Sequence, residues 1–219
     1  QSYEATMSDV FSSVRNEQTV VLDPARTAVL VIDMLNDFCK PGGKMVLPGY
    51  DRLVPPQVAL IEAARSPGAP VFWVIQSHDP RLRRDRELLK RGSHCLLGTW
   101  GVEVIEDLRP DESDFHLYKH RYSAFFQTPL DLLLKDMTCD QLIVFGIVTN
   151  ICVRSTVHDG FFLGYEVVVP EDCCAATGPR EQESSLYDIA THFGVVNRSG
   201  AVIEALRNRT ALTTVEGIV

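Results

Sequence analysis

Residues 141–162 read QLIVFGIVTNICVRSTVHDGFF and predict a strand, a short elbow and a helix in direct succession. The first eight residues are almost entirely apolar and rich in β-branched side chains, as in strands buried on both faces of a parallel sheet. A helical pattern follows over residues 150–164, with Cys152 in its first turn. A cysteine on a helix is usually a core residue, but one in the first turn faces backbone N–H groups that lower a thiol pKa. The segment therefore predicts a parallel sheet and a candidate nucleophile.

The same succession of strand and helix extends along most of the chain. Further apolar runs predict strands over residues 27–33, 69–76 and 165–172. Helical patterns lie over residues 52–66, 128–137, 150–164 and 179–193. This order predicts an α/β fold of three layers, doubly wound, with a mainly parallel central sheet flanked by helices.

A length of 219 residues suits one α/β domain. We expect an N-terminal arm over residues 1–24 and a single domain over residues 25–219. Residues 77–118 are less regular, and no strand or helix is predicted there. Within them, the loop 92–101 contains Trp100, which we expect to belong to a lid or to a contact between subunits.

Composition excludes several classes of function. The net charge is −8, and the longest basic run is RLRR at residues 81–84, which argues against nucleic acid and anionic membranes as partners. No apolar stretch reaches the roughly 18 residues of a membrane-spanning helix, and the first twenty residues lack the apolar region of a signal peptide. The six cysteines show no CxxC pair or zinc-like spacing, which predicts reduced thiols and a cytoplasmic location.

Asp33 is the second candidate for chemistry, because it closes the predicted strand over residues 27–33. In open parallel sheets, ligands bind beyond the carboxyl ends of the strands. Asp33 and Cys152 can therefore meet at the same edge of the sheet. From position alone, Asp33 equally suits a helix cap or a turn, and Cys152 suits core packing.

Three stretches together resemble the isochorismatase-like cysteine hydrolases, which include nicotinamidases, N-carbamoylsarcosine amidases, ureidoacrylate amidohydrolases and biuret hydrolases. They are VLVIDMLNDFCKPGG (29–43), YKHRYSAFFQTPLDLLL (118–134) and VFGIVTNICVRSTVHDGFFLGYEVVVPEDCCAA (144–176). The resemblance covers about residues 25–206, and it implies an isochorismatase-like hydrolase domain over residues 25–219.

The resemblance places the catalytic triad of this family on Asp33, Lys119 and Cys152. Cys152 would be the nucleophile, with its thiolate favoured by the Lys119 ammonium, and Asp33 would transfer protons. The resemblance also implies a cis peptide bond between Ile147 and Val148. The backbone N–H groups of Val148 and Cys152 would then form the oxyanion hole.

The same motifs suggest residues that contact the substrate. Asn36, Phe38, Arg121 and Tyr122 are placed by the motifs to supply hydrogen-bonding groups and an aromatic wall, although each equally suits a scaffold role. A guanidinium such as that of Arg121 can hold a carboxylate or a ureido carbonyl with two hydrogen bonds. His192 is a further candidate, and whether it contacts substrate stays open.

The chain departs from the pattern of metal-binding nicotinamidases, which carry an Asp-x-His pair after the second strand. Residues 74–85 read VIQSHDPRLRRD and contain no such pair. We therefore expect no catalytic metal and no other cofactor. This departure also argues against nicotinamide as the substrate.

Because Cys152 is present, the resemblance implies hydrolysis of a C–N bond. We expect a cysteine-dependent amidohydrolase that acts on a small ureide or carbamoyl compound, of the ureidoacrylate or biuret type, through a thioester. The alternatives are an amidase of another small acid amide (maleamate or N-carbamoyl amino acid type), a nicotinamidase, or a non-catalytic binding module. The expected partners are a small-molecule substrate and further copies of the chain in a dimer or tetramer.

Overall fold

The computed structural model describes residues 14–218, which form one α/β unit. The strands are β1 (Val20–Val21), β2 (Thr27–Ile32), β3 (Val71–Gln76), β4 (Phe115–Lys119), β5 (Gln141–Ile147), β6 (Glu166–Pro170), β7 (Cys174–Ala175), β8 (Val195–Asn197) and β9 (Ala211–Leu212). The α-helices are α2 (Asn36–Cys39), α3 (Val54–Arg65), α4 (Arg86–Arg91), α5 (Leu130–Asp136), α6 (Arg154–Phe162), α7 (Pro179–His192) and α8 (Ser199–Asn208).

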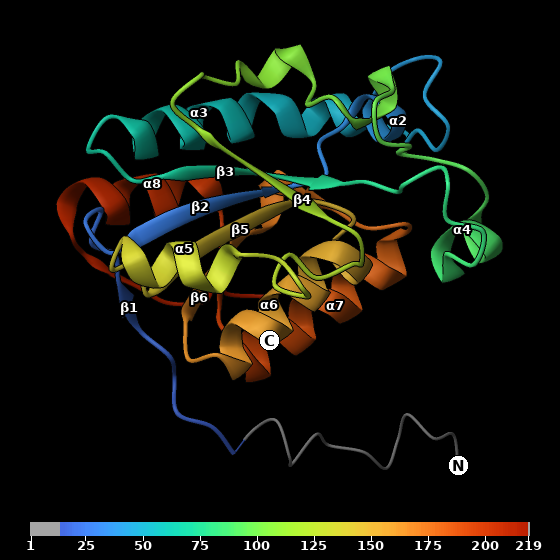
Figure 1. Cartoon of the computed structure of the whole chain (residues 1–219). Coiled ribbons are helices and arrows are strands. Elements are labelled where there is room, and N and C mark those ends of the chain that lie inside the picture. Colours follow the sequence, from blue (N-terminus) through green and yellow to red (C-terminus); the bar gives the residue numbers. More distant parts are fainter. Residues whose placement is uncertain (1–13, 219) are drawn as a thin grey trace, which may run out of the picture.

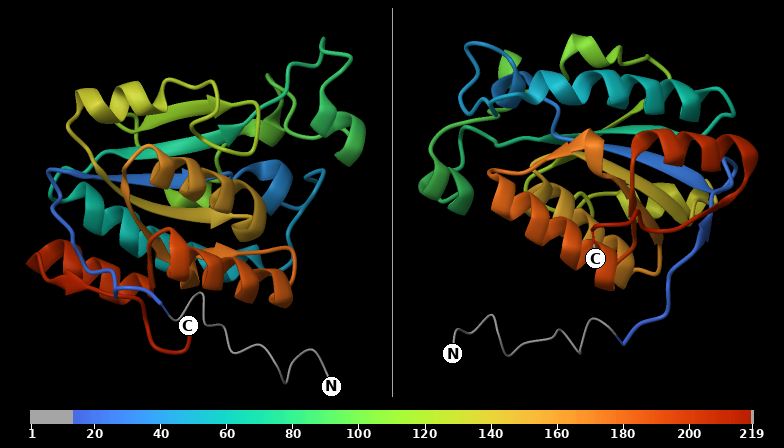
Figure 2. Two further views of the ribbon diagram at one scale, coloured as in Figure 1. Left: turned by 90° about the horizontal axis from the view of Figure 1, so that it is seen from below. Right: turned by 180° about the vertical axis from the view of Figure 1, so that it is seen from behind.

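The central sheet has the strand order β4-β3-β2-β5-β6-β8, and β7 adds a short pairing with β5. All of these pairings are parallel. Helices α3 and α8 pack together on one face, and α5, α6 and α7 lie on the other (Figures 1 and 2). The predicted three-layer, doubly wound α/β fold is confirmed.

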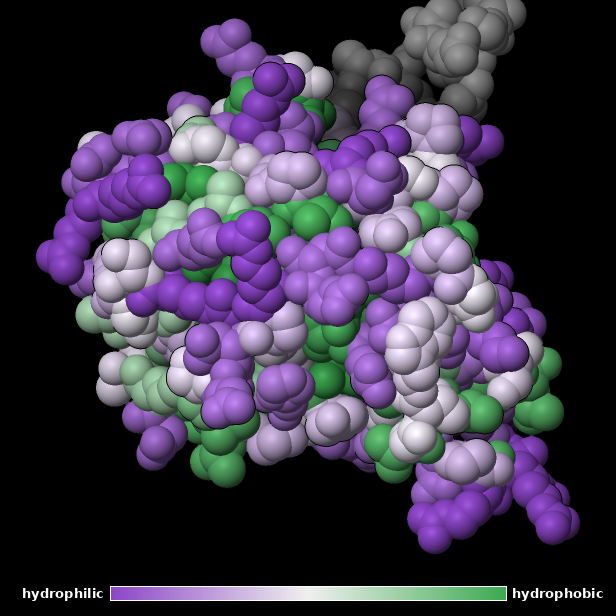
Figure 3. All heavy atoms as spheres, turned by 90° about the horizontal axis from the view of Figure 1, so that it is seen from above, coloured by the Kyte–Doolittle hydropathy of each residue, from purple (hydrophilic) through white to green (hydrophobic). Residues whose placement is uncertain are grey.

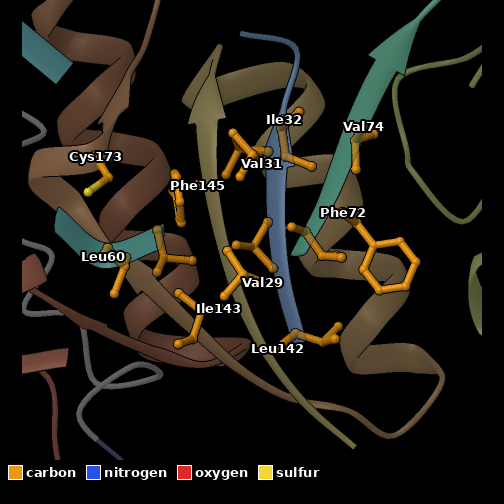
Figure 4. Packing of buried hydrophobic residues seen from close by; sticks show 14 of the residues in the cluster. Val29, Val31, Ile32, Leu60, Phe72, Val74, Leu142, Ile143, Phe145 and Cys173 are labelled. Carbon is orange, nitrogen blue, oxygen red and sulfur yellow. The ribbon is translucent and has the colours of Figure 1, made fainter. Parts of the chain in front are cut away.

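The core is centred on β2, β3 and β5, in which every residue is buried. Their apolar side chains point to both faces of the sheet, and Leu60 from α3 packs onto one of them (Figure 4). Burial on both faces explains why these strands appear in the sequence as continuous apolar runs.

On the face seen from above, hydrophobic residues form small areas separated by hydrophilic ones (Figure 3). None of the helices in the described part of the chain combines the length and the apolar character needed to cross a bilayer.

Two segments of the chain have a structure that differs from the prediction. Helix α4 and all but the last residue of strand β4 lie in the segment 77–118, where no element was predicted. The expected arm ended at residue 24, but Val20 and Val21 pair with β9 and Val20 is fully buried. The described part of the arm from residue 20 therefore belongs to the domain, and residues 1–13 of the arm lie outside the described residues.

The buried carboxylate of Asp37 holds together two loops at the carboxyl edge of the sheet. It accepts backbone hydrogen bonds from Lys44 at 3.1 Å and from Cys95 at 2.7 Å. A Cβ on Gly101 would lie 2.3 Å from its Oδ2 atom, so the loop can approach only with glycine there. The loop 92–101 is thereby fixed against α2, while Trp100 stays 48 % exposed.

Strands β2 and β5 approach each other closely at Gly146. This residue has φ +125°, and a Cβ built on it would lie 2.1 Å from the carbonyl oxygen of Ile32. Only glycine combines this backbone conformation with so close an approach. Gly146 therefore fixes the separation of the two strands close to their ends. Strand β2 is followed there by Asp33, and β5 is followed by the elbow.

We predict that Gly146→Ala lowers the free energy of unfolding by about 3–5 kcal/mol, because the new methyl group meets the backbone of a central strand. Gly164→Ala is the matched control: Gly164 also has a positive φ, +92°, but its Cβ would meet nothing within 4 Å. This control should lose only about 1–2 kcal/mol. Urea unfolding of both variants measures the difference, and equal losses would contradict the steric explanation.

Candidate active site

The three candidate catalytic residues meet at the carboxyl edge of the sheet. Asp33 directly follows β2, Lys119 ends β4, and Cys152 lies in a π-helical turn, Thr149–Val153, between β5 and α6. Helix α6 continues directly from this turn at Arg154, so Cys152 lies in the first turn of the helical segment, as expected, and that turn is π-helical. A π-turn of this kind is often found at functional sites.

The ammonium of Lys119 is the centre of the group. Its Nζ atom lies 2.8 Å from Asp33 Oδ2 and 3.6 Å from Cys152 Sγ, and it also donates to Gln76 Oε1. The side chains of Lys119 and Asp33 are 0 % and 1 % exposed. Burial alone would lower the pKa of Lys119, but the charges of Asp33 and Cys152 outweigh it and raise this pKa. Lys119 is therefore a cation in the resting site.

The thiol of Cys152 differs electrostatically from expectation. Burial raises its pKa well above the usual range, the Lys119 charge lowers it in part, and Asp33 raises it again. Burial therefore opposes formation of the thiolate, and the Lys119 ammonium offsets this only in part. Asp33 is the carboxylate adjacent to the thiol.

Asp33 is held rigidly in a conformation that few residues adopt. Its φ is +53°, in the left-handed region, where Asp is among the better tolerated non-glycine residues. Its Oδ1 atom accepts a hydrogen bond of 2.8 Å from the backbone N–H of Gln76 on β3. Its Oδ2 atom thus remains directed toward Lys119.

The elbow after β5 is the segment that leads from the sheet to Cys152. The peptide bond between Ile147 and Val148 is cis. Asn150 then exchanges two hydrogen bonds with Thr177, through Nδ2 at 3.0 Å and Oδ1 at 3.2 Å. The elbow is thereby tied to the segment that leads into α7.

A pocket of about 490 Å³ opens onto Cys152. Its lining includes Asp33 and Cys152 from the triad, Phe38 and Tyr122 as aromatic walls, and Glu87 and His94 as polar walls. The volume lies in the range of sites for small molecules. Two other hollows on the described surface, of about 660 and 390 Å³, are lined by none of the three candidate catalytic residues.

The residues expected to contact substrate fall into two groups. Phe38 and Tyr122 line the pocket. Asn36 instead donates to the carbonyl of Trp100 at 3.0 Å, and the guanidinium of Arg121 lies 3.6 Å from Asp85. His192 lies in the last turn of α7, next to Thr191, and is not among the residues that line the pocket.

A cluster that sequence reasoning missed adjoins the pocket. His78, Glu87 and His94 bring potential metal-ligand atoms within 4.8 Å of one another. Two imidazoles and a carboxylate are suitable ligands for zinc and related metals. The absence of an Asp-x-His pair therefore did not rule out such a cluster, because Glu87 comes from α4.

The ligand atoms of this cluster are already occupied by partners within the chain. The amide nitrogen of Gln76 lies 3.0 Å from His78 Nε2 and donates to Glu87 Oε2 at 3.1 Å. His94 lies 3.2 Å from Glu87 Oε1 and 2.8 Å from the carbonyl of Gly92. Burial would lower the pKa of His94, but these two hydrogen bonds outweigh it and raise this pKa. The three side chains and Gln76 form a closed hydrogen-bond network, and the absence of a catalytic metal stays a prediction.

Comparison with known proteins identifies the family. Residues 27–200 match the isochorismatase domain family. A cysteine hydrolase from Pseudomonas syringae pv. phaseolicola is similar at TM-score 0.83 and 31 % identity, over 90 % of this chain and 100 % of that chain. An N-carbamoylsarcosine amidase from Thermoplasma acidophilum gives TM-score 0.71 and 35 % identity, over 80 % and 96 % of the two chains.

A nicotinamidase/pyrazinamidase from Bacillus subtilis is also similar, at TM-score 0.73 and 26 % identity, over 79 % of this chain and 100 % of that chain. The family match extends from β2 through the start of α8 and so includes Asp33, Lys119 and Cys152. The chain belongs to the isochorismatase family and is an isochorismatase-like cysteine hydrolase.

Proposed function

We propose that the protein is a cysteine-dependent amidohydrolase that cleaves a C–N bond of a small ureide or carbamoyl compound, of the ureidoacrylate or biuret type. The observation that carries the proposal is the position of the Lys119 ammonium, which contacts both Asp33 and the Cys152 sulfur beside the pocket. This arrangement provides a nucleophile, a base and a fixed positive charge in one place.

In the first half of the reaction, Asp33 takes the proton of the Cys152 thiol as the sulfur bonds to the substrate carbonyl carbon. The backbone N–H groups of Val148 and Cys152 form the proposed oxyanion hole for the negative charge on the oxygen. Asp33 then gives its proton to the nitrogen as the C–N bond breaks. Ammonia or an amine leaves, and a thioester on Cys152 remains.

In the second half, water hydrolyses the thioester. Asp33 takes one proton from the water as the water oxygen bonds to the carbonyl carbon. The C–S bond breaks, and the proton returns to the sulfur of Cys152. The carboxylic or carbamic acid leaves and the thiol is restored, while Lys119 remains protonated throughout because its pKa is raised.

The pocket walls support a small, planar and polar substrate. Phe38 and Tyr122 offer aromatic surfaces, and Glu87 and His94 offer polar atoms on another wall. Support for a carbamoyl group comes from the likeness to a protein named as an N-carbamoylsarcosine amidase. Arg121 and Asn36, whose side chains contact other groups, are not part of the proposed substrate site.

We predict that Cys152→Ser removes nearly all turnover and leaves the fold intact. A serine hydroxyl ionises far less readily than a thiol, so the fall in kcat should be at least about 10³-fold. Ammonia release from ureidoacrylate analogues, biuret, N-carbamoyl amino acids, maleamate and nicotinamide measures turnover. If the variant keeps a tenth of the wild-type kcat on the best substrate, the thioester mechanism is wrong.

We predict that Tyr122→Ala lowers kcat/KM about tenfold on that substrate, because the pocket loses an aromatic wall. Its neighbour Arg121 provides the matched control. Arg121→Ala should change kcat/KM less than about threefold, since its half-exposed guanidinium faces Asp85 outside the pocket. A larger loss in Arg121→Ala than in Tyr122→Ala would show that the substrate reaches Arg121.

We predict that prolonged treatment with EDTA leaves kcat unchanged, because Gln76 and His94 already satisfy the atoms that would bind a metal. Elemental analysis of the purified protein should show less than about 0.1 equivalent of zinc, iron or manganese. Activity that EDTA removes and one of these metals restores would overturn the expectation and favour a nicotinamidase.

A further inference from the structure

Three polar atoms surround the Lys119 ammonium. It donates hydrogen bonds to Cys152 Sγ and to the side-chain oxygen of Gln76, and it forms an ion pair with Asp33 Oδ2. These three contacts together set its position. Gln76 is 1 % exposed and Lys119 is fully buried, so no bulk water competes for these bonds.

The orientation of the Gln76 amide is itself determined by its other neighbours. Its nitrogen lies 3.0 Å from His78 Nε2 and 3.1 Å from Glu87 Oε2. His78 Nδ1 lies 2.8 Å from the Asp85 carboxylate, which favours a proton on Nδ1 and leaves Nε2 as an acceptor. Both of these neighbours therefore accept hydrogen bonds, and only the amide NH₂ can face them. The amide oxygen consequently points to Lys119.

Gln76 also contacts Asp33. Its backbone N–H donates to Asp33 Oδ1 at 2.8 Å, and its residue pairs with Lys119 in the register between β3 and β4. One residue thus holds the base through its main chain and the ammonium through its side chain. Gln76 does not line the pocket, so it acts on the reaction only through these neighbours.

We infer that Gln76 is a positioning residue for the reaction: the cluster of Asp85, His78 and Glu87 orients its amide, and the amide oxygen holds the Lys119 ammonium against Cys152. This inference rests on the proposed function. In this arrangement the NH₂ group of Gln76 satisfies His78 and Glu87, so that the polar wall of the pocket and the triad form one connected network. The network lets the site keep a buried cation in place with groups of the chain alone.

Gln76→Met tests the inference, because methionine has a similar length and no amide. The ammonium should lose its fixed position, the thiolate of Cys152 should form less readily, and kcat should fall about 10–100-fold. KM should change less than about threefold, since Gln76 does not touch the pocket. The rate constant for alkylation of Cys152 by iodoacetamide at pH 8 should fall about tenfold, which corresponds to one unit in the pKa of the thiol.

Gln57→Met is the matched control. Gln57 is also a fully buried glutamine, but it lies on α3 and donates to the carbonyl of Cys173 at 2.9 Å. This variant should lose stability and keep the wild-type kcat and alkylation rate. Gln76→Glu is a second variant of nearly equal volume, and its added negative charge should also slow alkylation by raising the thiol pKa. Thermal unfolding of all variants defines a temperature at which each is folded.

The outcomes separate this inference from the proposed function. If wild-type Cys152 reacts faster than the other thiols and both Gln76 variants keep its alkylation rate and kcat, the positioning role is wrong and the proposed function stands. If KM rises and kcat does not fall, Gln76 shapes the pocket instead, and the inference also fails. If wild-type Cys152 reacts no faster than the five buried thiols, both proposals fail together.

Discussion

The buried ion pair between Asp33 and Lys119 is the constraint on which the site depends. Both side chains are removed from water, and an uncompensated buried charge would cost several kcal/mol. Such a pair persists only where hydrogen bonds satisfy the remaining atoms. Gln76 supplies them from the strand between the two, because β3 lies between β2 and β4 in the sheet. The order of the strands therefore decides that this carboxylate and this cation can be held together.

The backbone at the carboxyl edge brings Cys152 to this pair. Gly146 lets β5 approach the end of β2 more closely than any other residue would, and Asp33 leaves β2 with a positive φ. The chain then turns through a π-helical segment, so Cys152 reaches the ammonium before α6 begins. The glycine, the unusual conformation of Asp33 and the π-turn are local departures from regular structure, and all three occur where the triad assembles.

The sequence predicted the layers and the buried strands, because continuous apolar runs carry that signal. Its ordered motifs also indicated Asp33, Lys119 and Cys152, which the structure brings together, while their catalytic roles stay a prediction. It did not predict β4, whose residues alternate between exposed and buried at the edge of the sheet, or α4, which has no buried residue. Glu87 was missed because it lies on α4 and because its contacts with Gln76 and His94 form only in the folded chain. Arg121 lies two residues from Lys119 in sequence, but β4 ends at Lys119 and the chain then turns toward Asp85.

The raised pKa of Cys152 changes the interpretation of the triad. Burial is the largest cause of this raised pKa, the Lys119 ammonium lowers it only in part, and Asp33 raises it again. In the proposed mechanism, the charge on sulfur develops together with its attack on carbon, as Asp33 accepts the proton and the substrate carbonyl receives the electrons. The proposed oxyanion hole would face that charge, while Lys119 lies beside the sulfur. A cation already held by Asp33, Gln76 and Cys152 needs no rearrangement at this moment, which is the advantage of a preorganised site.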